Sequence, residues 1–203
     1  MSLSPRMRKR LLQLGLVLSG IIAAGIIAGR MAVDVRPVTQ EHQATRTPVV
    51  QEEISLYFST PDASGLLEEK RSVPRAGDDY TALDQIVTQL ARGPEDPGLS
   101  PVIPGQTRLL GVSRLDAKTL ELDFNRELID YHPGGSASEL LTVHALTNSI
   151  AAYMPDFERF VFKVEGQALE SLKGHVDLSR AVDLNRNWVR TEADTGDMIL
   201  TEE

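Results

Sequence analysis

Apolar residues at every second position predict strands with one buried face in three segments, residues 54–58, 120–124 and 160–164. Residues 109–115 lie just before the second of these segments. The short connection 116–118 predicts that the two pair as a hairpin. A short strand near 71–73 and a short hairpin arm at 168–172 are further candidates.

Asp78 and Asp79 precede a segment in which apolar residues recur at intervals of three and four, the spacing of a helix with one buried face. Either aspartate can cap the N-terminus of this helix. Gly93 and Pro94 are predicted to end it, because proline cannot donate the next backbone hydrogen bond. The apolar positions of the predicted helix are Tyr80, Leu83, Ile86, Val87 and Leu90.

A second helix is predicted after the glycines that follow Pro133. Ser136 and Glu139 have the spacing of a capping box, which would place the first turn at Ser136. The helix is predicted to end near Pro155. Its apolar face carries Leu140, Val143, Leu146, Ile150 and Met154.

The predicted elements follow one another as strand, helix, strand, strand, helix and strand. This order indicates the α/β class in the form of an α+β sandwich. We expect one mixed sheet of about four strands, connected by right-handed crossovers, with both helices packed on one face.

The chain begins with a basic cluster and then an uncharged segment, residues 11–29. Such a segment is long enough for a helix to cross a bilayer core of about 30 Å. The preceding cations would hold the N-terminus in the cytoplasm, so the rest of the chain would be extracytoplasmic. A cleaved signal peptide is the alternative, and the protein would then be secreted. The basic residues are Arg6, Arg8, Lys9 and Arg10.

These patterns divide the chain into five parts. A cytoplasmic N-terminus, an anchor and a polar linker would precede one domain, and an acidic C-terminal tail with Trp188 would follow it. The predicted bounds are 1–10, 11–29, 30–48, 49–179 and 180–203.

Composition narrows the possible partners. The chain has no cysteine, which excludes disulfides, thiolate zinc sites and a lipid-modified cysteine as an anchor. From Arg30 onward there are 17 basic and 29 acidic residues, a net charge of −12. Phosphate backbones are bound by clustered Lys and Arg, so we expect no nucleic-acid partner.

Candidate catalytic residues are scattered along the chain. His42 lies in the linker, His132 in a loop and His144 within the second helix. His175 and Asp177 would share one side of an extended segment, although a structural role is the simpler interpretation. We therefore predict no catalytic residue, no cofactor and no metal. The adjacent acidic pairs, Asp78 with Asp79 and Glu52 with Glu53, are interpreted as a helix cap and a strand approach.

Short sequences spread over residues 50–180 resemble, in their order and spacing, the GerMN domain family of sporulation and spore-germination proteins. They include Leu56-Tyr57-Phe58, Leu90-Ala91-Arg92-Gly93-Pro94, the segment 102–112, Asp123-Phe124, the segment 135–140, Val164-Glu165-Gly166 and Gly174-His175-Val176-Asp177. The resemblance implies a non-enzymatic envelope domain, often membrane-anchored or lipid-anchored, that builds protein assemblies. Many relatives have more than one copy of the domain or an anchoring cysteine, and this chain has neither.

We expect a membrane-tethered module that binds an envelope protein or a second copy of itself. The candidate contact regions are the loop 95–105 and the outer face of the second helix near His144 and Asn148. The alternative is a domain that binds or processes cell-wall material, for which Asp123 and His175 would be the residues to test.

Overall fold

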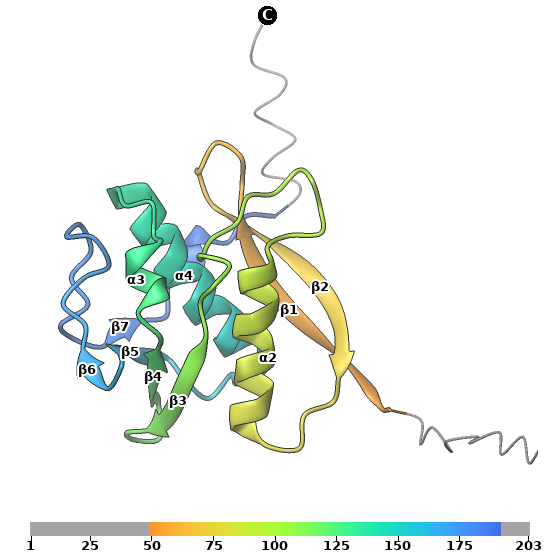
Figure 1. The fold of residues 1–203 in the computed structure, drawn as a ribbon. Helices are drawn as coiled ribbons and strands as arrows, with labels where there is room; N and C mark the ends of the chain where they lie inside the picture. Colours follow the sequence, from red (N-terminus) through yellow and green to blue (C-terminus); the bar gives the residue numbers. More distant parts are fainter. Residues whose placement is uncertain (1–48, 192–203) are drawn as a thin grey trace, which may run out of the picture. The chain divides into compact units, whose positions relative to one another are not determined.

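The structure, a computed structural model, describes residues 49–191 (Figure 1). The predicted anchor at 11–29, its basic flank and the linker lie outside the described residues, as does the end of the predicted tail. Within residues 49–191, no helix is both long enough and apolar enough to cross a membrane.

Strands β1 (Gln51–Ser59) and β2 (Leu66–Pro74) form an antiparallel hairpin that is a sheet of its own. Our prediction of one sheet is therefore wrong. The other edge of β1 faces helix α4 instead of a strand, and the Tyr57 backbone N–H donates to Ser149 Oγ at 3.0 Å. The apolar side of β1 is buried as its alternation predicted.

The second sheet is mixed and has the strand order β3-β4-β5-β6. The predicted hairpin is confirmed as an antiparallel pair, and β4 runs parallel to β5. Two short strands, β6 and β7, share the remaining edge of β5. The strands of this sheet are β3 (Leu109–Arg114), β4 (Thr119–Phe124), β5 (Arg159–Val164), β6 (Gln167–Ala168) and β7 (Val182–Asp183).

Helix α2 (Asp79–Arg92) follows the prediction at both ends. The Asp78 carboxylate accepts from the Thr81 backbone N–H at 2.9 Å, and the helix stops at Gly93. Gly93 has a φ of +84°, a conformation that glycine adopts without strain. The apolar face is buried except for Tyr80, which is 44% exposed and donates its hydroxyl to the Leu109 carbonyl.

Helix α4 (Ser136–Tyr153) is preceded by the short helix α3 (Glu127–Asp130) and is buried almost all round. Strand β1, helix α2 and the 3-10 turn η1 (Arg186–Trp188) pack against it. Every residue from Leu141 to Ala151 is buried, polar ones included. A helix covered on several sides has no outer face, so the predicted division into an apolar and a polar face does not hold.

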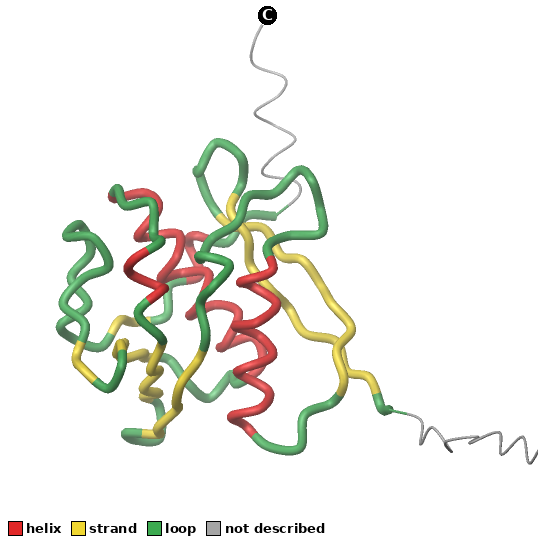
Figure 2. The backbone as a smooth tube through the Cα atoms, viewed as in Figure 1, coloured by secondary structure: helices red, strands yellow, loops and turns green. Residues whose placement is uncertain are grey.

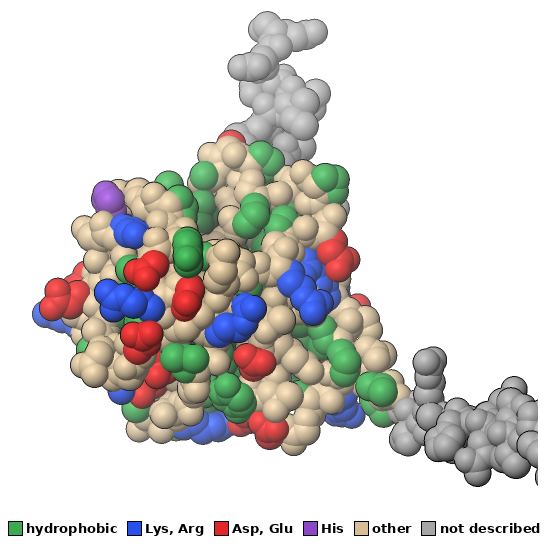
Figure 3. All heavy atoms as spheres, in the orientation of Figure 1, with side chains coloured by type: hydrophobic (Ala, Val, Ile, Leu, Met, Phe, Trp, Pro, Cys, Tyr) green, Lys and Arg blue, Asp and Glu red, His purple; other side chains and the backbone are tan. Residues whose placement is uncertain are grey.

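The segment from β7 to Arg190, which belongs to the predicted acidic tail, packs on this domain. Val189 bridges Leu66 in the parallel direction, and the Arg190 N–H donates to the Leu66 carbonyl at 2.7 Å. Trp188 is part of the packing, as a partly buried side chain against the core. On the face shown in Figure 3, acidic and basic side chains are interspersed.

Candidate functional site: a groove at the start of α4

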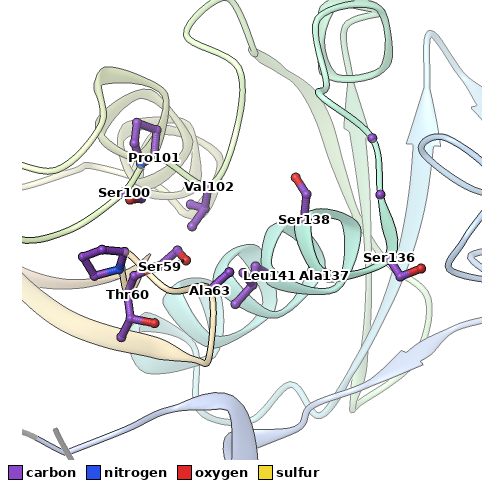
Figure 4. A pocket seen from close by; sticks show the side chains of 13 residues that line it. Ser59, Thr60, Ala63, Ser100, Pro101, Val102, Ser136, Ala137, Ser138 and Leu141 are labelled. Atoms are coloured by element: carbon purple, nitrogen blue, oxygen red, sulfur yellow. Dashed lines mark hydrogen bonds between the residues drawn. The ribbon is translucent and has the colours of Figure 1, made fainter. Parts of the chain in front are cut away.

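A groove of about 450 Å³ lies between the turn after β1, the loop after α2 and the start of α4. The turn and the loop lie side by side at one end of α2 (Figure 2). In Figure 4, Thr60 and Pro101 belong to one wall, and Ala137 and Ser138 belong to the facing wall. The groove thus joins three segments that are far apart in the sequence.

The first wall is held by hydrogen bonds within the hairpin turn. Thr60 Oγ1 accepts from the backbone N–H groups of Ser64 and Gly65, at 3.1 and 3.2 Å. Ser59 and Ser100 exchange backbone hydrogen bonds of 3.2 and 2.8 Å, which tie the turn to the loop after α2. Hydrogen bonds therefore fix both the hairpin turn and its contact with the loop after α2.

Arg71 fixes the start of that loop from the buried side of β2. Its guanidinium donates to the Gly93 carbonyl at 2.6 Å and to the Gln89 carbonyl at 3.1 Å, which satisfies carbonyls at the end of α2. Glu69 pairs with Arg71 and accepts from the backbone N–H groups of Glu95 and Asp96 at 2.9 Å each. The Arg71–Glu69 pair is thus a structural clamp on the predicted contact loop.

His132 lies beneath the groove in a chain of buried hydrogen bonds. Its Nδ1 accepts from the Gly134 N–H at 3.0 Å, so its Nε2 carries the proton and donates to Thr142 Oγ1 at 2.9 Å. The Thr142 hydroxyl then donates to the Val102 carbonyl. Burial lowers the pKa of His132, which favours this neutral tautomer. This series of hydrogen bonds connects the loop after α2 to helix α4, and it uses both ring nitrogens of His132.

The capping box predicted for Ser136 and Glu139 does not form. Gly135, with a φ of +91°, occupies the N-cap position, and no side chain caps the helix. The reason is that Glu139 is buried and serves a different segment: its carboxylate binds His175 Nδ1 at 2.7 Å and accepts from the backbone N–H groups of His175 and Val176. Burial alone would raise the pKa of Glu139, but these hydrogen bonds lower it.

His175 therefore pairs with Glu139 and not with Asp177. Asp177 turns to its own segment and accepts from the backbone N–H and the hydroxyl of Ser179. The His175 side chain is 45% exposed, whereas that of Glu139 is fully buried. The pair fixes the segment after β6 to the first turn of α4. Sequence reasoning missed it because the two residues are 36 positions apart, and the spacing of Glu139 fitted a cap.

The predicted contact surface at His144 and Asn148 is wrong, because the C-terminal segment covers it. The His144 ring stacks on Trp188 with centroids 5.3 Å apart. Asn148 Nδ2 donates to the carbonyls of His144 and Asn185, at 2.8 and 3.1 Å. Burial lowers the pKa of His144. Neither side chain is free to bind a partner in this arrangement.

The carboxylates considered for chemistry have structural partners. Asp123 accepts from the Gly166 N–H at 3.0 Å, which closes the turn after β5. Asp79 pairs with Arg114 at 2.7 Å, and Glu53 pairs with Lys70 at 3.0 Å. Within residues 49–191, no group of three or more His, Asp or Glu side chains could hold a metal ion.

The described residues lining the groove present hydroxyl groups, backbone and small apolar side chains, with no ionisable side chain among them. General acid–base catalysis requires such a side chain within reach of the reacting group. The lining can instead donate and accept hydrogen bonds along a bound chain. Of the two predicted contact regions, only the loop 95–105 contributes to it, through Ser100, Pro101 and Val102.

The sequence profile of the Germane family, described as sporulation and spore germination, matches residues 55–170. The chain belongs to this family. Its fold is similar to that of the tandem GerMN domains of the sporulation protein GerM from Bacillus subtilis, with a TM-score of 0.54 and 16% identity. That match covers 68% of this chain and 47% of the other, so the chain spans about half of the tandem protein.

Two further structures match this family member with lower TM-scores. The first GerMN domain of GerM has a TM-score of 0.49 at 17% identity, covering 67% of this chain and 98% of the domain. A candidate lipoprotein from Clostridium perfringens has a TM-score of 0.46 at 23% identity, covering 67% of this chain and 89% of that protein. Among curated proteins, none matches the chain.

Proposed function

We propose that this member of the Germane family is a membrane-tethered, extracytoplasmic and non-catalytic assembly module that binds an envelope protein through the groove at the start of α4. The observation that carries the proposal is the lining of the groove. It offers many hydrogen-bonding groups and no ionisable side chain, which suits recognition of a protein segment better than chemistry.

Preorganisation of the groove supports the same function. Its loop is tied to Ser59 by backbone bonds, to Glu69 by charge-assisted bonds and to Thr142 by a buried hydroxyl. A site fixed before binding loses little conformational entropy when a partner arrives. The family description, sporulation and spore germination, supports an envelope setting for that partner.

The tether in this proposal is the uncharged segment 11–29. Cell fractionation should recover the full chain with the membrane. Protease added from outside should digest the domain while the cytoplasmic membrane is intact. Deletion of 11–29 should release the protein from the membrane. Retention at the membrane after the deletion would contradict this part of the proposal.

Site-specific photo-crosslinking in the native host tests the groove. A crosslinking amino acid at Ser138 of the full chain should capture one envelope protein, and the same group at Ala152 should not. Both residues are on α4, but only Ser138 lines the groove.

A blocking variant supplies the control. Ala137→Trp fills the exposed first turn of α4 beside the groove, whereas Ala152→Trp places the same side chain at the exposed far end. We expect Ala137→Trp to abolish capture and Ala152→Trp to leave it unchanged. Equal effects of the two variants would contradict groove binding, and capture of wall material would favour the wall-binding alternative.

A further inference from the structure

Strand β2 has one edge that is mostly unpaired. Its register with β1 runs without a bulge from Leu66 to Pro74. In Figure 1, one side of β2 faces β1 and the other side is the free edge of the hairpin. At Leu66, the start of this outer edge pairs with Val189 and Arg190.

The register shows which backbone groups point outward. In an antiparallel pair, alternate residues exchange hydrogen bonds with the partner strand, and the residues between them direct their N–H and C=O groups to the other side. The Leu66 carbonyl already accepts from Arg190 on the outer side. Glu68, Lys70 and Ser72 have the same parity, so their backbone groups point outward as well.

The exposed side chains along this edge alternate in charge. Glu68 is followed two positions later by Lys70, and both side chains lie on the solvent face of the sheet. In an antiparallel pair of two β2 strands, these two exposed positions are complementary in charge. A second copy shifted to place Glu68 opposite the partner's Lys70 would bring two pairs of opposite charges together.

Other registers with the same parity are worse. One places Glu68 opposite the partner's Glu68, and another places Lys70 opposite the partner's Lys70. Like charges directly opposite each other across two strands are destabilising. In the Glu68–Lys70 register, Glu69 falls opposite the partner's Glu69 on the other face of the sheet, where each of these carboxylates is already paired with Arg71 of its own chain. The exposed charges of Glu68 and Lys70 therefore favour this register of self-pairing.

We propose that two copies of this chain associate through antiparallel pairing of their β2 edges, with Glu68 opposite the partner's Lys70. This inference rests on the assembly role proposed above and names a second copy as one partner. Such an edge is a ready template for pairing. The Arg190 bond at one end and Pro74 at the other keep the ladder short, so the contact is weak and reversible.

Charge reversal tests the pairing in the full chain. Two differently tagged copies are expressed together, and recovery of one with the other is measured. Wild-type copies should recover each other. Glu68→Lys in both copies, or Lys70→Glu in both, should reduce recovery roughly tenfold because both contacts become repulsive.

The decisive arm mixes the two variants. One copy carrying Glu68→Lys and one carrying Lys70→Glu again place opposite charges across the edge, so recovery should return to the wild-type level. Failure of the mixture to recover, or no recovery of wild-type copies at all, would overturn the proposal. Unchanged recovery with either variant alone would overturn it as well.

A matched control uses another exposed pair between neighbouring segments, Lys118 with Glu158 at 2.7 Å. Reversal of either charge there should not change recovery. Ala137→Trp should also leave it unchanged while it blocks capture at the groove. Loss of self-pairing and loss of groove binding can therefore be distinguished, and either proposal can fail alone.

Discussion

The start and the middle of α4 differ in how well their buried polar groups are paired. At the start of the helix, His132, Thr142 and Glu139 each use their polar atoms in hydrogen bonds to other segments. In the middle, His144 Nδ1 and Asn148 Oδ1 are buried without a partner beneath the C-terminal segment. The buried polar groups are therefore better paired at the start of α4, beside the groove, than in its middle.

This difference indicates different roles for the start and the middle of α4. Satisfied buried networks rigidify a region, and an unpaired buried polar atom is a cost to stability. The groove end is thus a fixed scaffold, and the C-terminal segment is a cover held mainly by ring stacking and a few backbone bonds.

Glu139→Ala should have the largest effect, a loss of about 3 kcal/mol in the free energy of unfolding. The substitution leaves the backbone N–H groups of His175 and Val176 without their acceptor and opens a gap at a fully buried position. Chemical denaturation measures it. His175→Ala, which removes the partly exposed partner, should cost clearly less, and equal losses would contradict the central place given to Glu139.

Thr142→Val should cost about 2 kcal/mol. Valine has nearly the same shape, so the loss reports the hydroxyl that links His132 to the Val102 carbonyl. The same variant should weaken capture at the groove, because Val102 is part of the groove lining. Thermal unfolding and the crosslinking assay check the two parts, and a loss of stability below about 0.5 kcal/mol would show that the network is dispensable.

Sequence reasoning predicted the parts of this fold that depend on local pattern. The caps and apolar face of α2 and the β3–β4 hairpin follow from neighbouring residues, and the structure confirms them. The full length of β2 and its separate sheet with β1 could not be predicted in this way, because some buried positions of β2 carry charged residues such as Arg71. A buried arginine stabilised by helix carbonyls has no signature in a hydrophobic pattern.

The candidate site was harder to predict than the fold. Ser100, Thr60 and Ala137 are ordinary residues in isolation, and only the tertiary structure brings them to one groove. His144 and Asn148 were expected on an outer face of the helix, but the C-terminal segment covers them. That segment shows little periodicity, so the sequence did not predict this contact. Long-range contacts of this kind leave no spacing signal to detect.

The two histidines should also give the protein a pH dependence of moderate size. Burial lowers the pKa of both His132 and His144, so the unfolded chain binds protons that the folded protein does not. Stability therefore falls as pH decreases below about 6.5, the ordinary pKa of histidine. His144→Phe should keep the stack on Trp188 and reduce this dependence, whereas His132→Phe should destabilise the protein at every pH. Denaturation across the pH range distinguishes the two.

Asn148→Leu should have the smallest effect, a loss below about 1 kcal/mol, although Asn148 is as buried as Thr142. The substitution removes two hydrogen bonds to carbonyls but also removes a buried oxygen that has no partner, so the two effects largely offset each other. Denaturation of Asn148→Leu and Thr142→Val side by side measures the contrast directly. If Asn148→Leu proved as costly as Thr142→Val, the cover over the middle of α4 would be as firmly held as the groove, and the distinction between scaffold and cover would not stand.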